Sequence, residues 1–77
     1  MSDRLQQIVA KSLMLDEARV SDDLQYNSIP EWDSVAHMVL VADLEDAYEA
    51  MLDTDDILAM SSVGAIREIM RKHGADV

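Results

Sequence analysis

Apolar residues recur every three or four positions over the first part of the chain, as they do on one face of a helix. The residues on this face are Leu5, Ile8, Val9, Ser12 and Leu13. Ser2 precedes them and can accept a hydrogen bond from a free N–H group of the first turn. The pattern predicts a helix from about residue 3 to about residue 14.

The next stretch, 16–33, shows no apolar period and contains turn-forming residues. These are Ser21, Asn27, Ser28 and Pro30. We expect a long loop that Val20, Leu24 and Ile29 hold against the core. A loop of this length in so small a domain usually has a function.

A second helix is predicted to start at or beside Ser34. Asp33 is a good N-cap, and no residue from Ser34 to Met51 breaks a helix. Asp53 or Thr54 can then cap a short third helix. The apolar residues of that helix are Ile57, Leu58 and Met60.

A last helix is predicted to follow Ser61 or Ser62, either of which can cap it. His73 stands at its end, and Gly74 is a C-terminal stop. The residues that share its apolar face are Val63, Ile66, Ile69 and Met70. No strand pattern or internal repeat occurs, so the predicted class is all-α: a small four-helix bundle of three main helices and one short one.

The second helix has two apolar faces when its residues are placed about 100° apart around the axis. The face wide enough to meet the core holds Leu40, Val41, Leu44, Ala47 and Tyr48. The opposite face holds Val35, Met38, Val39 and Ala42, with Asp43, Glu45, Asp46 and Glu49 around and after it. Met38 or Val39 could pack under the loop or against the third helix. As a set, an apolar patch rimmed by one sign of charge favours a docking face.

The charge is unevenly distributed along the 77 residues. Six Lys and Arg stand against 16 Asp and Glu, for a net charge of −10, and residues 20–66 contain no Lys or Arg. Such a surface can serve solubility alone, although solubilising surfaces normally mix both signs. An acidic middle also attracts basic patches on partner proteins.

Length and composition exclude several classes of protein. A chain of 77 residues has room for one core, so a single domain over 1–77 is expected, and we expect a monomer. The absence of cysteine favours a reducing compartment, most simply the cytoplasm. The first ten residues lack the apolar stretch of a signal peptide, and no run is long enough for a membrane span. The acidic charge argues against nucleic acid as a partner.

Few residues offer catalytic or metal-binding chemistry. A lone serine such as Ser34 at a helix start is most often a first-turn residue. Asp33 and His37 lie too close along one helix to form a hydrolase triad with it, and no Gly-rich elbow precedes it. We expect His37 at the edge of the core face, bonded to the loop. The cluster Asp53, Asp55 and Asp56 does not match a calcium loop, and two distant histidines without cysteine do not suggest zinc.

The run Trp32-Asp33-Ser34-Val35, after a long loop and at the start of an acidic helix, resembles the phosphopantetheine-binding carrier family of acyl and peptidyl carrier proteins. The resemblance extends over nearly the whole chain. It includes the run 44–48 (Leu-Glu-Asp-Ala-Tyr) and the run 61–63 (Ser-Ser-Val). The family often has Gly near positions 31 and 32, whereas Trp32 resembles free-standing Trp-Asp-Ser carriers. Many fatty-acid carriers have an acidic residue where this chain has Val39.

The resemblance implies a carrier and not an enzyme. It implies that Ser34 is esterified by a 4′-phosphopantetheine arm from coenzyme A, transferred by a phosphopantetheinyl transferase, with Asp33 capping the helix and presenting Ser34. The arm would hold an acyl or aminoacyl thioester and supply the thiol that this chain lacks. No metal is implied. The family's partners are enzymes that recognise the second helix, here through Val35, Met38, Val39, Ala42, Glu45, Asp46 and Glu49.

The expected partners are the transferase, an acyl- or aminoacyl-loading ligase, and downstream acyl-processing enzymes with basic docking patches. The expected pathway is lipid or secondary-metabolite biosynthesis. An alternative from another class is an unmodified acidic helical module that docks into a basic groove and has no use for Ser34.

Overall fold

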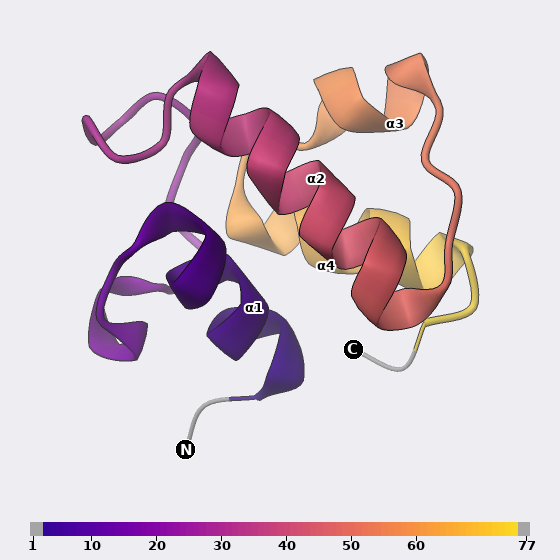
Figure 1. Cartoon of the computed structure of the whole chain (residues 1–77), viewed down its shortest axis with the longest axis horizontal. Helices are drawn as coiled ribbons and strands as arrows, with labels where there is room; N and C mark the ends of the chain where they lie inside the picture. Colours follow the sequence, from indigo (N-terminus) through magenta and orange to yellow (C-terminus); the bar gives the residue numbers. More distant parts are fainter. Residues whose placement is uncertain (1–2, 76–77) are drawn as a thin grey trace.

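The computed structural model describes residues 3–75, and over this range four α-helices and one 3₁₀ helix follow one another (Figure 1). They are α1 (Arg4–Leu13), η1 (Glu17–Arg19), α2 (Ser34–Tyr48), α3 (Thr54–Ala59) and α4 (Val63–Lys72). These residues contain no strand, only an isolated bridge between Gln25 and Ser62. The predicted all-α bundle with a long loop before the second helix is confirmed. The 3₁₀ helix within that loop was not predicted.

Each α-helix begins at a side chain that accepts a hydrogen bond from its first turn, which satisfies an otherwise unpaired N–H group. Asp33 takes this position for α2, as predicted. For α3 and α4 it is taken by Asp53 and Ser62, in each case one of the two predicted candidates. Asp3 takes it for α1 and accepts from the Gln6 N–H at 2.8 Å. The predicted cap Ser2 lies outside the described residues. Gly74 follows α4 with φ +85°, a conformation that favours glycine, and so acts as the predicted stop.

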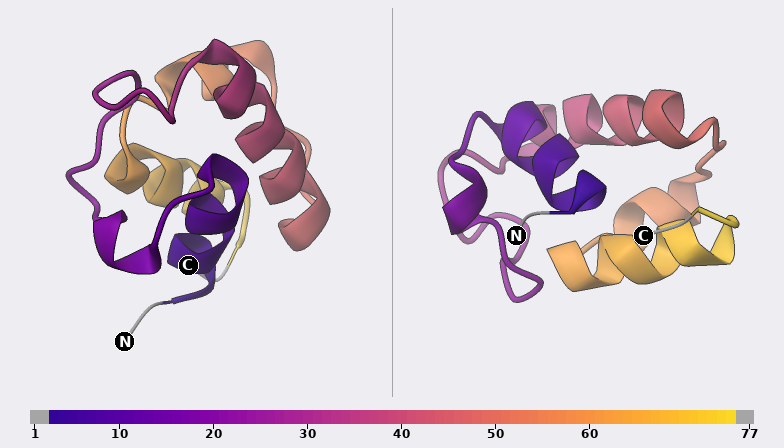
Figure 2. Two further views of the ribbon diagram at one scale, coloured as in Figure 1. Left: turned by 60° about the vertical axis from the view of Figure 1, so that its left-hand side comes forward. Right: turned by 90° about the horizontal axis from the view of Figure 1, so that it is seen from below.

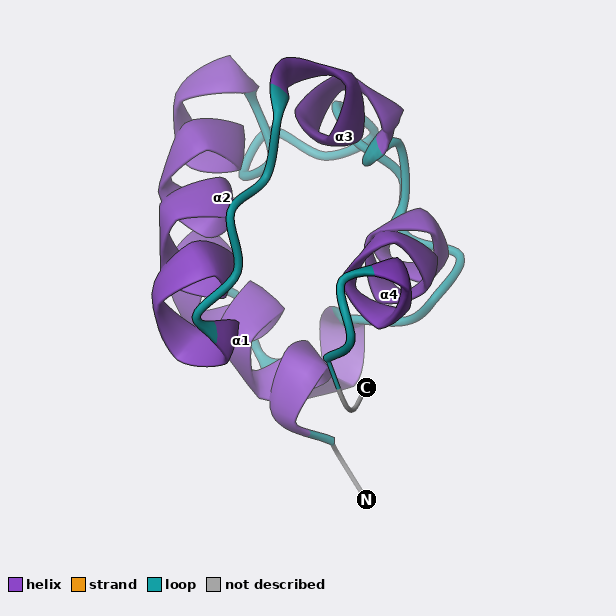
Figure 3. Cartoon of the chain, turned by 90° about the vertical axis from the view of Figure 1, so that its right-hand side faces the viewer, coloured by secondary structure: helices purple, strands orange, loops and turns teal. Residues whose placement is uncertain are grey.

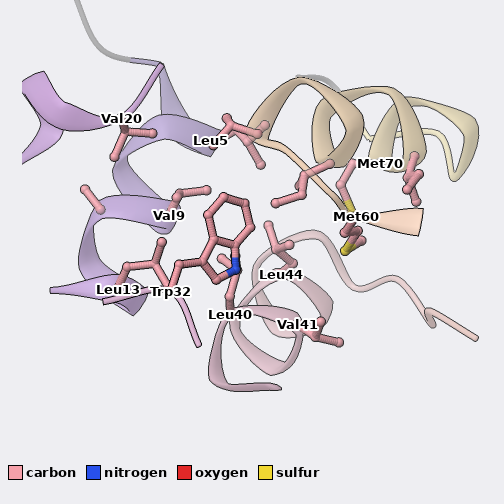
Figure 4. Close-up of a cluster of buried hydrophobic side chains, with 14 of the residues drawn as sticks. Leu5, Val9, Leu13, Val20, Trp32, Leu40, Val41, Leu44, Met60 and Met70 are labelled. Carbon is pink, nitrogen blue, oxygen red and sulfur yellow. The ribbon is translucent and has the colours of Figure 1, made fainter. Parts of the chain in front are cut away.

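The buried side chains form one cluster, with Trp32 at its centre. Trp32 is 0% exposed and lies between side chains of α1 and side chains of α2 (Figure 4). The labelled neighbours are Val9 and Leu13 from α1 and Leu40 and Leu44 from α2. A residue from the loop therefore fills the space between two helices. The predicted core faces of α2 and α4 are buried in the same cluster, apart from the half-buried Ala47 and Tyr48.

The long loop is attached to the start of α4 by main-chain hydrogen bonds. Val63 N–H donates to Leu24 O at 2.9 Å, and Gly64 N–H donates to Asp22 O at 3.0 Å. A Cβ atom at Gly64 would lie 3.2 Å from Asp22 O, so this close approach favours glycine. Two further views show the loop passing around one end of the bundle (Figure 2). These bonds hold the segment that leads to Ser34.

Helix α3 crosses the bundle between α2 and α4 (Figure 3). None of its residues is fully buried. Its first turn is joined to the end of α4, where His73 Nε2 lies 2.7 Å from Asp56 Oδ2. The hydrogen bond from His73 holds the pKa of Asp56 below its usual value. This contact helps to hold the first turn of α3 against the end of α4.

Arg67 on α4 joins two distant segments of the chain. Its guanidinium lies 2.8 Å from Asp3 Oδ2 and 3.1 Å from Asp22 Oδ1. The pKa of Asp3 is below its usual 3.8, chiefly because the Gln6 N–H bonds its carboxylate; burial opposes this shift, and Arg67 adds to it. A carboxyl group whose pKa is lower in the folded state stabilises the fold above its unfolded pKa. This contribution is lost as the pH falls through the folded pKa.

We therefore expect the melting temperature to fall as the pH is lowered from about 5 to about 2, across the range where Asp3 gains its proton. Arg67→Gln should lower stability by about 0.5–1.5 kcal/mol at neutral pH, because two exposed ion pairs are lost. It should also make the acid-induced decrease shallower. Thermal unfolding followed by circular dichroism at each pH measures both effects. An unchanged pH profile in Arg67→Gln would contradict this account.

Candidate functional site

Ser34 is the first residue of α2 and lies at the surface. Its hydroxyl makes no hydrogen bond with any residue of the described range, whereas the adjacent Asp33 accepts from the Ala36 N–H at 2.8 Å. Asp33 thus fixes the start of the helix and leaves the neighbouring hydroxyl available. The predicted cap at Asp33 is confirmed.

An apolar pocket of about 280 Å³ opens beside Ser34, between α2 and α3. Its lining residues are Tyr26, Ser34, His37, Met38, Ile57, Leu58, Met60 and Ser61. Most of its surface is carbon, so it favours an apolar group over a charged one. A group attached to Ser34 would lie at the mouth of this pocket.

The second apolar face of α2 is exposed to solvent, as predicted. Val35 is 72% exposed, Met38 56% and Val39 47%, and Ala42 is exposed beside them. Neither Met38 nor Val39 is buried beneath the loop or against α3, although Met38 lines a pocket whose other wall includes Ile57 and Leu58 of α3. Met38 borders the pocket, while Val35, Val39 and Ala42 continue along the helix from Ser34. We call Val35, Met38, Val39 and Ala42 the α2 stripe.

The acidic residues of α2 differ in how free they are to meet a partner. Glu45 is half-buried, and its carboxylate accepts from the Leu52 N–H at 3.0 Å, which holds the chain leaving α2. Asp43 accepts from the Ser12 hydroxyl and so joins α2 to α1. Asp46 and Glu49 are exposed. Of the three acidic residues predicted to dock, Glu45 therefore also has a structural role.

His37 is 8% exposed and bonds to the loop, as predicted, and also to α3, which was not predicted. The Trp32 Nε1–H donates to His37 Nδ1 at 3.0 Å, and His37 Nε2 lies 3.0 Å from Ile57 O. Both ring nitrogens are therefore occupied. His37 cannot also serve as a base for Ser34 in this arrangement, so the site lacks the bonded chain of groups that a serine hydrolase needs.

Two features of the site were missed from the sequence. Leu58 was named only as an apolar residue of the third helix, and the structure leaves it 76% exposed beside the pocket. Trp32 was considered only as part of the resemblance to other carriers. In the structure it is a core residue, and its indole N–H donates to His37, which lines the pocket.

Within residues 3–75, no group of three or more histidine or acidic side chains could hold a metal ion. No helix in that range has the length and apolar character needed to cross a bilayer.

Two comparisons with known proteins, one of sequence and one of structure, each found an acyl carrier protein. No protein-family model matches the chain. An acyl carrier protein of Lactobacillus johnsonii is 26% identical over 70 residues, which cover 91% of this chain and 88% of that protein. The solution structure of a holo acyl carrier protein from Geobacter metallireducens superposes with a TM-score of 0.79 and 25% identity, over 90% of this chain and 79% of that one.

The likenesses cover almost the whole chain and agree in both sequence and fold. Over nearly its whole length the chain is thus similar to acyl carrier proteins.

Proposed function

We propose that this protein carries an acyl or aminoacyl group as a thioester on a 4′-phosphopantetheine arm attached to Ser34. The observation that carries the proposal is the exposed hydroxyl of Ser34, which makes no hydrogen bond within residues 3–75 and stands at the start of a capped helix beside an apolar pocket. The protein is a carrier and not an enzyme, in keeping with both relatives. It would act as a single domain, 1–77, in the cytoplasm.

The attachment of the arm needs little from the carrier itself. Ser34 Oγ would form a new bond to the phosphorus of coenzyme A that bears the pantetheine, while the pyrophosphate bond breaks and adenosine 3′,5′-bisphosphate leaves. The hydroxyl proton would pass to a base of the transferase, because His37 is occupied on both nitrogens. When bound, the arm supplies the thiol that this cysteine-free chain lacks.

Acyl-processing enzymes are the partners that this role requires, and their docking surface is the α2 stripe with Asp46 and Glu49. We propose a phosphopantetheinyl transferase, a loading ligase and downstream enzymes, each with an apolar contact and a basic patch. Exposed apolar side chains give contact area, and charges at the rim speed the encounter. Weak docking of this kind allows the carrier to pass from one enzyme to the next.

Intact-mass measurement tests the attachment directly. The purified chain is incubated with coenzyme A, magnesium and a broad-specificity phosphopantetheinyl transferase, beside a control carrier known to be modified. We expect a gain in mass of one phosphopantetheine arm. A chain that stays unmodified under conditions that load the control would overturn the proposal.

Asp46 provides the cleanest test of electrostatic docking. It lies about 18 Å along the helix from Ser34, at the ordinary rise per residue, and is exposed. We expect Asp46→Lys to lower kcat/KM for modification by about 2- to 10-fold at low salt, with the loss shrinking near 1 M salt as charges are screened. Asp23→Lys makes the same charge change in the loop and should have a smaller effect. Equal losses for the two variants, or a loss independent of salt, would contradict docking at Asp46.

A further inference from the structure

The hydrogen bonds of His37 specify which of its two nitrogens carries the proton. The indole Nε1–H of Trp32 can only donate, so His37 Nδ1, 3.0 Å away, must accept. The main-chain oxygen of Ile57 can only accept, so His37 Nε2, also 3.0 Å away, must donate. The network is satisfied by one form alone, the neutral imidazole with its proton on Nε2.

These two bonds join three elements at the end of the molecule where Ser34 lies. Trp32 belongs to the loop, His37 to α2 and Ile57 to α3, and His37 stands about one turn after Ser34. His37 and Ile57 both line the pocket beside Ser34. No residue of α3 is fully buried, and its bond to His37 is one of the contacts that place this pocket wall.

We propose that His37 is a positioning residue for the Ser34 site: its neutral Nε2–H form holds the loop, α2 and α3 together around Ser34, and uptake of a proton releases Trp32. A protonated imidazole carries N–H groups on both nitrogens and cannot accept from the indole. The indole N–H would then be buried without an acceptor, which lowers the stability of this arrangement. The bond to Ile57 would remain, so the change would act first on the loop segment that leads into Ser34.

No carboxylate on the surrounding elements is bonded to His37 within the described residues. In the loop, Glu31 pairs with Arg19, and the ring centroid of Tyr26 lies 5.1 Å from that of His37. At the start of α2, Asp33 accepts from the Ala36 N–H. On α3, Asp55 is exposed, and Asp56 lies against His73. The capping residue Asp53 accepts from the Asp56 N–H. Without a bonded anion, the protonated ring gains no replacement for the indole contact.

Nitrogen-15 NMR of the unmodified protein tests the network without any partner enzyme. The chain has one tryptophan and two histidines, so the relevant resonances are few. At neutral pH we expect the nitrogen shifts of the Nε2–H form for His37. As the pH falls and His37 gains its proton, the indole Nε1–H resonance should move with it, and its exchange with water should quicken by about 2- to 10-fold.

Three variants test whether the change in the indole resonance with pH is caused by His37. His73→Gln removes the other imidazole and should leave the indole titration unchanged. His37→Asn places an amide oxygen near the position of Nδ1, so Trp32 keeps an acceptor that does not titrate, and the indole resonance should stay constant. Should that variant fold poorly, Trp32→Phe removes the donor while keeping a ring, and the nitrogen shifts of His37 should then no longer show the Nε2–H form alone. An Nδ1–H form of His37, or an indole resonance that ignores its protonation, would overturn the inference.

A kinetic measurement then tests whether the hydrogen bonds of His37 affect the modification of Ser34. Of the experiments in this subsection, this one alone rests on the proposed function. The same transferase modifies the natural chain and His37→Asn across the pH range, so the enzyme's own pH dependence cancels in the ratio of kcat/KM. We expect the ratio of natural chain to variant to fall by about 2- to 10-fold as His37 gains its proton. A ratio that is constant with pH would refute the positioning role. Failure to modify either chain would count against the carrier proposal, while the NMR result would still decide the network.

Discussion

Replacing Ser34 by alanine is expected to abolish attachment of the phosphopantetheine arm while leaving the helical content unchanged. The hydroxyl makes no hydrogen bond with the described residues, and Asp33, not Ser34, caps α2. Alanine is also a good helix former, so stability should change by no more than about 0.5 kcal/mol. Intact mass measures the attachment, and circular dichroism measures the fold.

Ser61→Ala is the matched control for this experiment. Ser61 lines the same pocket and is exposed, but it lies between α3 and α4. Its alanine variant should gain the arm like the natural chain. A gain of mass in Ser34→Ala would place the attachment elsewhere. If the biological activity survived Ser34→Ala and was lost in Asp46→Lys, the alternative of an unmodified docking module would be preferred.

Trp32→Ala is expected to cost about 3–5 kcal/mol of folding free energy, the range for removing a large aromatic side chain from a core. Trp32 is completely buried between α1 and α2, and its indole N–H donates a hydrogen bond to His37 Nδ1. A chain of 77 residues has a total stability of about 4–12 kcal/mol, so this loss removes a large share of the total and should lower the urea concentration at the unfolding midpoint. Urea unfolding followed by circular dichroism provides the measurement.

Trp32→Phe separates packing from the hydrogen bond. Phenylalanine fills much of the same space but leaves His37 Nδ1 without its donor, so we expect a smaller loss, about 1–3 kcal/mol. Both variants should retain Ser34 as the attachment residue wherever they fold. A Trp32→Ala variant within 1 kcal/mol of the natural chain would contradict the central place of Trp32 in the core.

The helix starts were predictable because capping is a local interaction. Asp33, Asp53 and Ser62 each accept from an N–H three residues later, within reach of the chain's own next turn. Where two neighbouring residues could cap, the sequence left the choice open, as with Ser61 and Ser62. The 3₁₀ helix at Glu17–Arg19 was missed because a single short turn leaves no apolar period to detect.

The two-faced character of α2 was also readable in advance, because helical geometry alone places side chains around an axis. Leu40, Val41 and Leu44 are buried on one side, and Val35 is exposed on the other. The position of Ser34 at the start of that helix followed from the cap. The family likeness of the Asp33-Ser34 pair then suggested what the serine does.

Other features depended on contacts between residues far apart in the chain. The oxygen that accepts from His37 belongs to Ile57, 20 residues later. Glu45 holds Leu52 across the turn after α2, and Leu58 points away from the core although it is apolar. Periodicity reports which side of a helix is apolar, but it does not report how short α3 packs against its neighbours. By itself the sequence determined the four α-helices, the cap of α2 and the exposed stripe beside Ser34. Only the tertiary structure, which brings the loop, α2 and α3 together, decided two features: Trp32 fills the core, and His37 bonds to both the loop and α3. Hydrogen bonds and packing between residues so far apart in the chain leave no periodic signal in the sequence.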